Sequence, residues 1–253
     1  MAKKVGIVFG TRPDAIKMAP VLLELRRSEE FEPITISTGQ HRQMLDQVLR
    51  VFDVQVDVEL DLMRHNQSLS ELTCRILTAM DTQLAQAPLD CLLVQGDTTT
   101  AFAAALAAFY RKVPVAHVEA GLRTRDIFQP WPEEANRRLA AVVTQLHFAP
   151  TPLSRENLLA EGICPNEVVV TGNTIVDSVQ KLLEMQTIDL PLPDGVPDDD
   201  SPMILVTAHR RESWGAELEA ICNSIVDLVE RFPYIRVIYP VHLNPNVRTT
   251  VEA

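Results

Sequence analysis

The chain has 253 residues, 46% of them hydrophobic, which is enough to bury the core of one large domain or two small ones. Its formal net charge of −11 argues against general affinity for nucleic acid or anionic membranes, although a local basic pocket remains compatible with it. The four cysteines form no CxxC pair and lack metal-ligand spacing, so we interpret them as reduced thiols.

The N-terminus leads from MAKK directly into the apolar stretch VGIVFG, which lacks the features of a signal peptide. No apolar run approaches membrane-spanning length. We therefore expect a soluble, cytoplasmic protein.

Short apolar runs alternate with helical patterns, which predicts an α/β fold with a parallel sheet. In the first predicted helix, Thr11 and Asp14 form a capping box, and Pro20 predicts a kink or a later helix start. Strands are predicted at 5–9, 34–37, 91–94, 115–118, 146–149, 168–170, 204–206 and 235–239. Helices are predicted at 14–27, 43–51, 68–85, 99–111, 133–143, 154–160, 175–185 and 217–231.

One stretch interrupts this alternation. Residues 189–202, DLPLPDGVPDDDSP, are rich in proline and aspartate and lack apolar periodicity, which is typical of a linker. We predict a Rossmann-like domain over 1–188 and the start of a second, incomplete one over 203–253. The second is predicted to be incomplete because a parallel sheet with so few strands would leave much of both its faces uncovered.

Polar turns follow the predicted strands, at the sheet edge where ligands bind in open α/β folds. Each turn also has a structural interpretation. GTRPD fits a helix cap and an anion site equally well, GDTTT is common N-cap chemistry, and His117 is more often structural than catalytic. The adjacent Arg210 and Arg211 suit a phosphate, which guanidinium groups bind bidentately.

The segment 117–138, HVEAGLRTRDIFQPWPEEANRR, is the most informative stretch. It places Glu119 at a strand end and Glu133 and Glu134 at a helix start. Carboxylates are rarely buried without a partner, so this mixture indicates a site, although the two later glutamates also suit a helix N-terminus. The HVE string lacks the PCxxC partner of zinc deaminases, and we predict no metal.

Eight strings resemble the non-hydrolysing bacterial UDP-N-acetylglucosamine 2-epimerases, in order and over nearly the whole chain: GTRPDAIKMAP, GQHRQMLDQVL, QGDTTT, HVEAGLRT, PWPEEANRR, TGNT, VTAHRRES and YPVHLNPNVR. The resemblance implies two Rossmann-like halves of the glycosyltransferase-B type. It also implies interconversion of UDP-N-acetylglucosamine and UDP-N-acetylmannosamine without a cofactor, for bacterial surface polysaccharides. The family's SGG-x-QEEA motif, which grips the uridine and diphosphate, is not in this sequence.

The resemblance also implies roles for individual residues. Asp97, Glu119 and Glu133 match catalytic carboxylates, and His209 matches a histidine at the diphosphate. The substrate-binding set comprises Arg12, Lys17, Arg210, Arg211 and Glu212. Part of a site for an activating second UDP-N-acetylglucosamine is matched by Gln40, Gln43 and His242, but Asn66 replaces the arginine found there, which argues against activation.

The reaction needs such groups because no carbonyl acidifies the C2–H of the sugar. Breaking the anomeric C1–O bond makes the C2 proton removable, UDP leaves as an anion, and a glucal is re-protonated from the opposite face. Carboxylates serve as base, acid and cation stabilisers, and cations hold the diphosphate. Which carboxylate serves which face stays open. We expect a homodimer. The alternatives are a hydrolysing relative, which releases free N-acetylmannosamine and UDP, and an inactive sugar-nucleotide-binding fragment.

Overall fold

The computed structural model describes residues 2–39, 42–64, 67–185, 196, 199–209, 213–242 and 244–252, without the side chains of residues 42–44, 47 and 246. Several predicted site positions lie outside these described residues: Gln40, Asn66, Arg210, Arg211, Glu212 and the side chain of Gln43. The chain divides into two compact units, Met1–Ile188 and Asp189–Ala253.

The N-terminal unit contains a seven-stranded parallel sheet in the order β3-β2-β1-β4-β5-β6-β7, which confirms the predicted α/β class. Its strands are β1 (Lys3–Phe9), β2 (Phe31–Ser37), β3 (Val58–Glu59), β4 (Cys91–Gln95), β5 (Val115–Val118), β6 (Leu146–Ala149) and β7 (Val168–Val170). Its helices are α1 (Arg12–Arg27), α2 (Arg42–Val51), α3 (Leu69–Gln86), α4 (Thr99–Tyr110), α5 (Glu133–Val142), α6 (Pro152–Ala160) and α7 (Thr174–Glu184), with a 3-10 turn at Pro165–Glu167.

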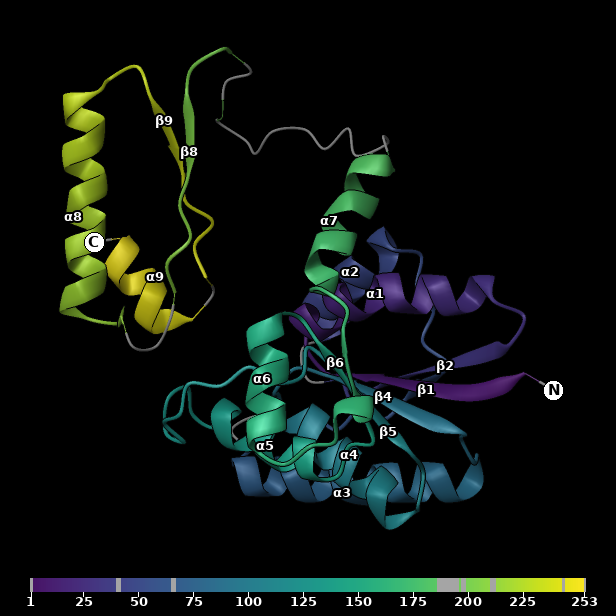
Figure 1. Ribbon diagram of the computed structural model, residues 1–253. Coiled ribbons are helices and arrows are strands. Elements are labelled where there is room, and N and C mark those ends of the chain that lie inside the picture. The colour runs from purple at the N-terminus through teal and green to yellow at the C-terminus, as the bar shows by residue number, and fades with distance from the viewer. Residues whose placement is uncertain are drawn as a thin grey trace. The chain divides into compact units, whose positions relative to one another are not determined.

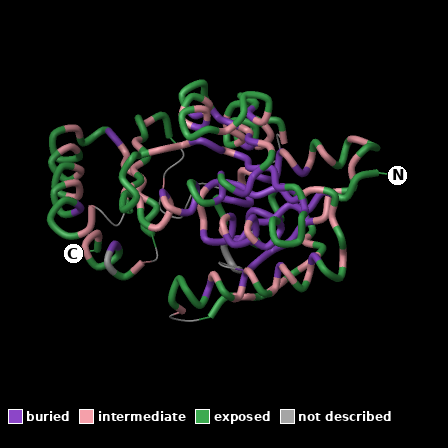
Figure 2. The backbone as a smooth tube through the Cα atoms, turned by 60° about the horizontal axis from the view of Figure 1, so that its bottom comes forward, coloured by how far each residue is buried: buried purple, intermediate pink, exposed green. Residues whose placement is uncertain are grey.

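Helices cover both faces of this sheet. Helices α1, α2 and α7 lie on one side, and α3, α4 and α5 lie on the other (Figure 1). Along β4, Leu92 and Val94 join the apolar cluster under α3 and α4, whereas Leu93 joins the cluster under α1 and α2. This alternation follows from the pleat of a strand. Figure 2 shows the buried residues concentrated along the central strands, so the carboxyl ends of those strands stand on a rigid base.

Helix α1 runs without interruption through Pro20, so a later helix start is wrong. Pro20 has no N–H to donate to the carbonyl of Ile16 one turn earlier. The hydroxyl of Ser178, a fully buried residue of α7, lies 2.6 Å from that carbonyl oxygen and supplies the missing donor. Thr11 and Asp14 form the predicted capping box. Helix α7 thus supplies the donor that the Ile16 carbonyl of α1 loses because of Pro20.

The C-terminal unit contains the parallel pair β8 (Met203–Leu205) and β9 (Arg236–Ile238), with α8 (Ala216–Arg231) and α9 (Pro245–Val251). Helix α9 lies where only an irregular tail is predicted, because seven residues carry little periodicity. Among the described residues of this unit, the buried hydrophobic ones are Leu218, Ile235 and Val247, so its core is small. No helix in the described part of the chain is long and apolar enough to cross a membrane.

Candidate active site

The strand order reverses between β1 and β4. In open α/β sheets, ligands bind beyond the carboxyl ends of the strands at such a switch point. Lys17 lies in the helix that follows β1, Asp97 follows β4, and Glu119 directly follows β5. Because β1, β4 and β5 are neighbours in the sheet, these three residues belong to one edge of it.

Glu119 and Lys17 form an ion pair at this edge. The ammonium nitrogen of Lys17 lies 2.7 Å from both Oε1 and Oε2 of Glu119, whose side chain is only 9% exposed. The backbone of Glu119 has a positive φ of 64°, which is uncommon for a residue with a Cβ. Four other described residues with a Cβ also have a positive φ, so the partly buried ion pair with Lys17, rather than the backbone conformation alone, supports a functional interpretation of Glu119.

Asp97 belongs to the turn between β4 and α4. Thr98 caps α4, because its side chain accepts the N–H of Ala101 at 3.2 Å, and this leaves the Asp97 carboxylate available. Arg137 Nη2 lies 2.8 Å from Asp97 Oδ2. Burial raises the pKa of Asp97 above its ordinary value; the charge of Arg137 opposes this rise and that of Glu119 adds to it.

The two glutamates at the start of α5 have different surroundings. Glu133 is half-buried and makes none of the hydrogen bonds or ion pairs found among the described residues. Glu134 is completely buried; its Oε2 accepts the N–H of Thr124 at 3.1 Å and lies 3.5 Å from Arg137 Nε. Consecutive residues of a helix point about 100° apart, so only one of the pair can face Arg137.

The turn after β1 is a helix cap. The Asp14 carboxylate accepts the N–H groups of Gly10 at 3.2 Å and Thr11 at 3.1 Å, so these donors are already used. A Cβ at Gly10 would lie 2.4 Å from the hydroxyl oxygens of Thr38 and Thr100. A larger residue at position 10 would therefore have to displace these two hydroxyl groups. Arg12, in the first turn of α1, is exposed.

His117 has the structural role that the sequence favours. It is 1% exposed, and its Nε2 lies 2.7 Å from the carbonyl oxygen of Gly96. Burial lowers the pKa of His117 to about 4, so the ring is neutral at pH 7 and Nε2–H donates to Gly96. The ring ties the end of β5 to the turn that carries Asp97.

In the C-terminal unit, the rings of His209 and His242 stack with 5.2 Å between centroids and 12° between planes. The family resemblance implies separate roles for them, at the diphosphate and at an activator site. Nδ1 of His242 accepts the N–H of Asn244 at 3.1 Å, and Nε1–H of Trp214 donates to the carbonyl of His209 at 3.2 Å. The structure thus brings these two predicted residues together within their own unit.

Sequence reasoning missed two residues of the site, Asn136 and Arg137. Asn136 Nδ2 donates to the backbone oxygen of Asp97 at 3.0 Å, and Arg137 pairs with its carboxylate. The spacing of Glu134 and Arg137, three residues apart in a predicted helix, was the available signal, because such residues share a helix face. The described residues contain no group of His, Cys, Asp or Glu suited to a metal ion.

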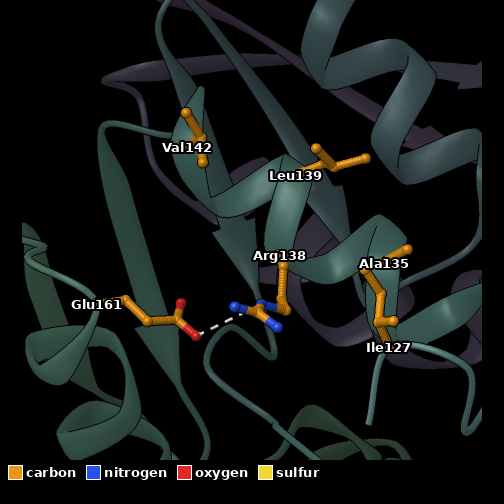
Figure 3. Close-up of a pocket in the computed structure, with 6 residues that line it drawn as sticks. All are labelled: Ile127, Ala135, Arg138, Leu139, Val142 and Glu161. Atoms are coloured by element: carbon orange, nitrogen blue, oxygen red, sulfur yellow. Dashed lines mark ion pairs between the residues drawn. The ribbon is translucent and has the colours of Figure 1, made fainter. Parts of the chain in front are cut away.

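A pocket of about 420 Å³ lies on the outer face of α5. It is lined by Ile127, Ala135, Arg138, Leu139, Val142 and Glu161 (Figure 3). None of the predicted site residues lines it. The residues that α5 contributes recur three or four positions apart, so they form one stripe of the helix, separate from Glu134 and Arg137.

The sequence model of the family described as UDP-N-acetylglucosamine 2-epimerase matches residues 23–253. A curated UDP-N-acetylglucosamine 2-epimerase from Neisseria meningitidis is 50% identical over 98% of this chain, which spans 68% of that relative. The crystal structure of the Neisseria meningitidis UDP-GlcNAc 2-epimerase bound to UDP-GlcNAc superposes with a TM-score of 0.92 at 48% identity, covering 98% of this chain and 68% of that one. The Methanocaldococcus jannaschii enzyme in complex with UDP-GlcNAc and UDP gives a TM-score of 0.81 at 29% identity, with the same two shares. This chain therefore belongs to the UDP-N-acetylglucosamine 2-epimerase family.

Proposed function

We propose that the chain catalyses reversible epimerisation at C2 of UDP-N-acetylglucosamine, giving UDP-N-acetylmannosamine by elimination and re-addition of UDP. The observation that carries this proposal is the edge formed by β1, β4 and β5, where Asp97 and the Lys17–Glu119 pair meet. The bound UDP-GlcNAc and UDP of the related structures support this choice of substrate.

The two carboxylates at the edge have different electrostatic surroundings. Glu119 lies against an ammonium, whereas burial raises the pKa of Asp97. A group whose pKa is moved toward the working pH exchanges protons efficiently, so Asp97 suits proton transfer at C2. Glu119 and the half-buried Glu133 are the remaining candidates for the opposite face and for the developing charge at C1.

The leaving diphosphate needs cations and hydrogen-bond donors. We assign this task to His209 together with the cationic side chains of Arg12, Lys17, Arg210 and Arg211, and we add Glu212 to the substrate-binding set without a role at the diphosphate. Gln40, Gln43 and His242 match part of a site for a second, activating UDP-N-acetylglucosamine, but Asn66 in place of the arginine argues against activation. We place the activity in the cytoplasm, because all four cysteines are free, as is usual in a reducing compartment.

Proton NMR of a reaction in D₂O tests the activity. We expect the two UDP-sugars to interconvert and the product to carry deuterium at C2. A hydrolysing enzyme would release free N-acetylmannosamine instead. Asp97→Asn and Glu119→Gln should each slow turnover by about 100-fold or more while thermal unfolding stays close to that of the wild type. Near-normal rates in both variants would contradict the assignment of these carboxylates.

The chain spans about two-thirds of its relatives' length (68%), which calls for a second arm of the assay. The 253-residue chain is assayed beside a fusion to the remaining third of the Neisseria relative. Activity in the fusion alone supports a sugar-nucleotide-binding role for the shorter chain. Absence of interconversion in both proteins would contradict the proposed reaction.

We also propose that the protein is a homodimer that associates through the outer face of α5. Val142 is 79% exposed and Leu139 is 50% exposed, and both line the pocket shown in Figure 3. Apolar side chains gathered beside a hollow are typical of an association surface. A second copy of this chain, which brings the same apolar stripe, matches such a surface.

A further inference from the structure

Helix α5 holds Asp97 at two points. Asn136 donates to the backbone oxygen of Asp97 at 3.0 Å, and Arg137 lies 2.8 Å from its carboxylate. Helix α5 thus holds both the main chain and the side chain of Asp97, which follows β4. The inference that follows rests on the proposed function, since it concerns how a proposed catalytic carboxylate is held.

Arg137 lies between two carboxylates. Its side chain is 10% exposed; Nη2 lies 2.8 Å from Asp97 Oδ2, and Nε lies 3.5 Å from Glu134 Oε2. A guanidinium group is a rigid plane of donors in which Nε and Nη2 lie side by side, so a carboxylate near Nε restricts the directions in which Nη2 can meet Asp97. Among the described residues Arg137 Nε has no hydrogen-bond partner, so Glu134 acts on this guanidinium group through its charge and its place beside Nε.

Glu134 is costly to bury. Its side chain is 0% exposed, and its Oε1 has no hydrogen-bond partner among the described residues. A buried ion pair adds little net stability compared with apolar side chains of similar volume, because desolvation of the charges offsets their attraction. The fold gains little stability from a glutamate at this place. A carboxylate beside Arg137 does, however, restrict where that guanidinium group can lie.

We propose that Arg137 is a positioning residue that keeps the Asp97 carboxylate charged and in one orientation, and that Glu134 acts through Arg137. Glu133 is then the member of the glutamate pair that remains to meet the substrate. The two positions should affect Asp97 in opposite directions. Arg137 opposes the rise in the Asp97 pKa, whereas Glu134 competes with Asp97 for the same guanidinium.

The test measures the titration midpoint of the Asp97 carboxyl carbon by ¹³C NMR, with the signal assigned by its loss in Asp97→Asn. Arg137→Met should raise this midpoint by about one pH unit or more. Glu134→Gln keeps an acceptor for Thr124 but removes the competing charge, so it should lower the midpoint. Arg138→Met is the matched control, because Arg138 is an exposed neighbour 3.8 Å from Glu161, and it should leave the midpoint unchanged.

Kinetics on the same proteins connect the midpoint to turnover. Arg137→Met should lower kcat by about 100-fold with little change in KM, because Asp97 is misplaced rather than the substrate lost. Arg137→Lys keeps the charge without the planar fork, so we expect a near-normal midpoint with a kcat about tenfold lower. Arg138→Met should have the kcat of the wild type.

Arg137→Met leaves the buried Glu134 carboxylate and the partly buried Asp97 carboxylate without their cation, which destabilises the fold. The double variant Glu134→Gln/Arg137→Met removes one of these charges and keeps the test available, and its Asp97 midpoint should also rise. An unchanged midpoint in the double variant, or a rise in Glu134→Gln, would overturn the proposal. A wild-type chain and fusion that fail to interconvert the sugars would contradict the proposed function instead, while the NMR midpoints still decide the role of Arg137.

Discussion

Some titratable residues of this fold have a structural role rather than a role in the proposed site, and His117 is one of them. His117 is buried, neutral at pH 7, and bound to the carbonyl of Gly96. Its folded-state pKa of about 4 lies below the ordinary 6.5 of histidine. Between these values the unfolded chain binds a proton that the folded chain does not. The contribution of His117 to stability is therefore present above pH 6.5 and is lost as the pH falls toward 4.

His117→Gln should remove this pH dependence while a side-chain donor for Gly96 remains. Wild-type protein should lose about 2–3 kcal/mol of unfolding free energy through His117 between pH 7.5 and pH 4.5. The variant should lose correspondingly less over the same interval. Urea denaturation followed by circular dichroism at the two pH values measures both. Equal losses in the two proteins would show that His117 does not carry this linkage.

At the scale of elements, the fold depends on contacts that join helices distant in the chain. Helix α1 keeps its course through Pro20 because Ser178 of α7 donates to the Ile16 carbonyl. The two helices pack against each other, so the carbonyl would lie in their contact without that donor. The hydroxyl also lies 3.0 Å from the carbonyl of Thr174 in its own helix.

A double-mutant cycle tests this arrangement. Ser178→Ala should cost about 1–3 kcal/mol of unfolding free energy, because it removes a donor from a buried acceptor. In a Pro20→Ala background the residue at 20 regains its N–H, so the same change should cost clearly less. Chemical denaturation of the four proteins gives the coupling energy. Strictly additive costs would rule out the proposed compensation.

The sequence predicted those elements whose signals are local. The strands at 115–118, 146–149 and 168–170 coincide with β5, β6 and β7, because each is an apolar run bounded by polar turns. Strand β3 has two residues and α9 has seven, too few for a periodic pattern. The sequence also marked Glu133 and Glu134, but which of them is buried depends on how α5 meets Thr124 and Arg137. The choice between the two glutamates therefore depends on tertiary contacts, which a local sequence pattern does not contain.

At the scale of the whole molecule, the N-terminal unit combines a covered sheet with an apolar stripe that stays exposed. The stripe on the outer face of α5 contains Leu139 and Val142, beside Ile127 (Figure 3). The net charge of −11 opposes close approach of two copies, so apolar burial has to outweigh that repulsion. Salt screens the repulsion and leaves the apolar contribution in place.

Val142→Asp should therefore shift the protein from dimer to monomer, because it places a carboxylate in the proposed contact. Sedimentation analysis at several concentrations measures the change, and a raised salt concentration should strengthen association of the wild type. Glu161 lines the same pocket. Glu161→Gln removes a negative charge there, whereas Val142→Asp adds one, so this control variant should remain dimeric. A monomeric wild-type protein, or a Val142→Asp variant that remains dimeric, would contradict this interface.

The positive φ of Glu119 has a consequence for sequence design on this backbone. Glycine adopts such a conformation without the steric conflict that a Cβ introduces. A procedure that chooses each residue for its fit to the backbone would therefore write glycine at position 119 and remove the carboxylate that pairs with Lys17. Optimising this chain for stability alone and preserving its proposed chemistry are opposing goals at this one position.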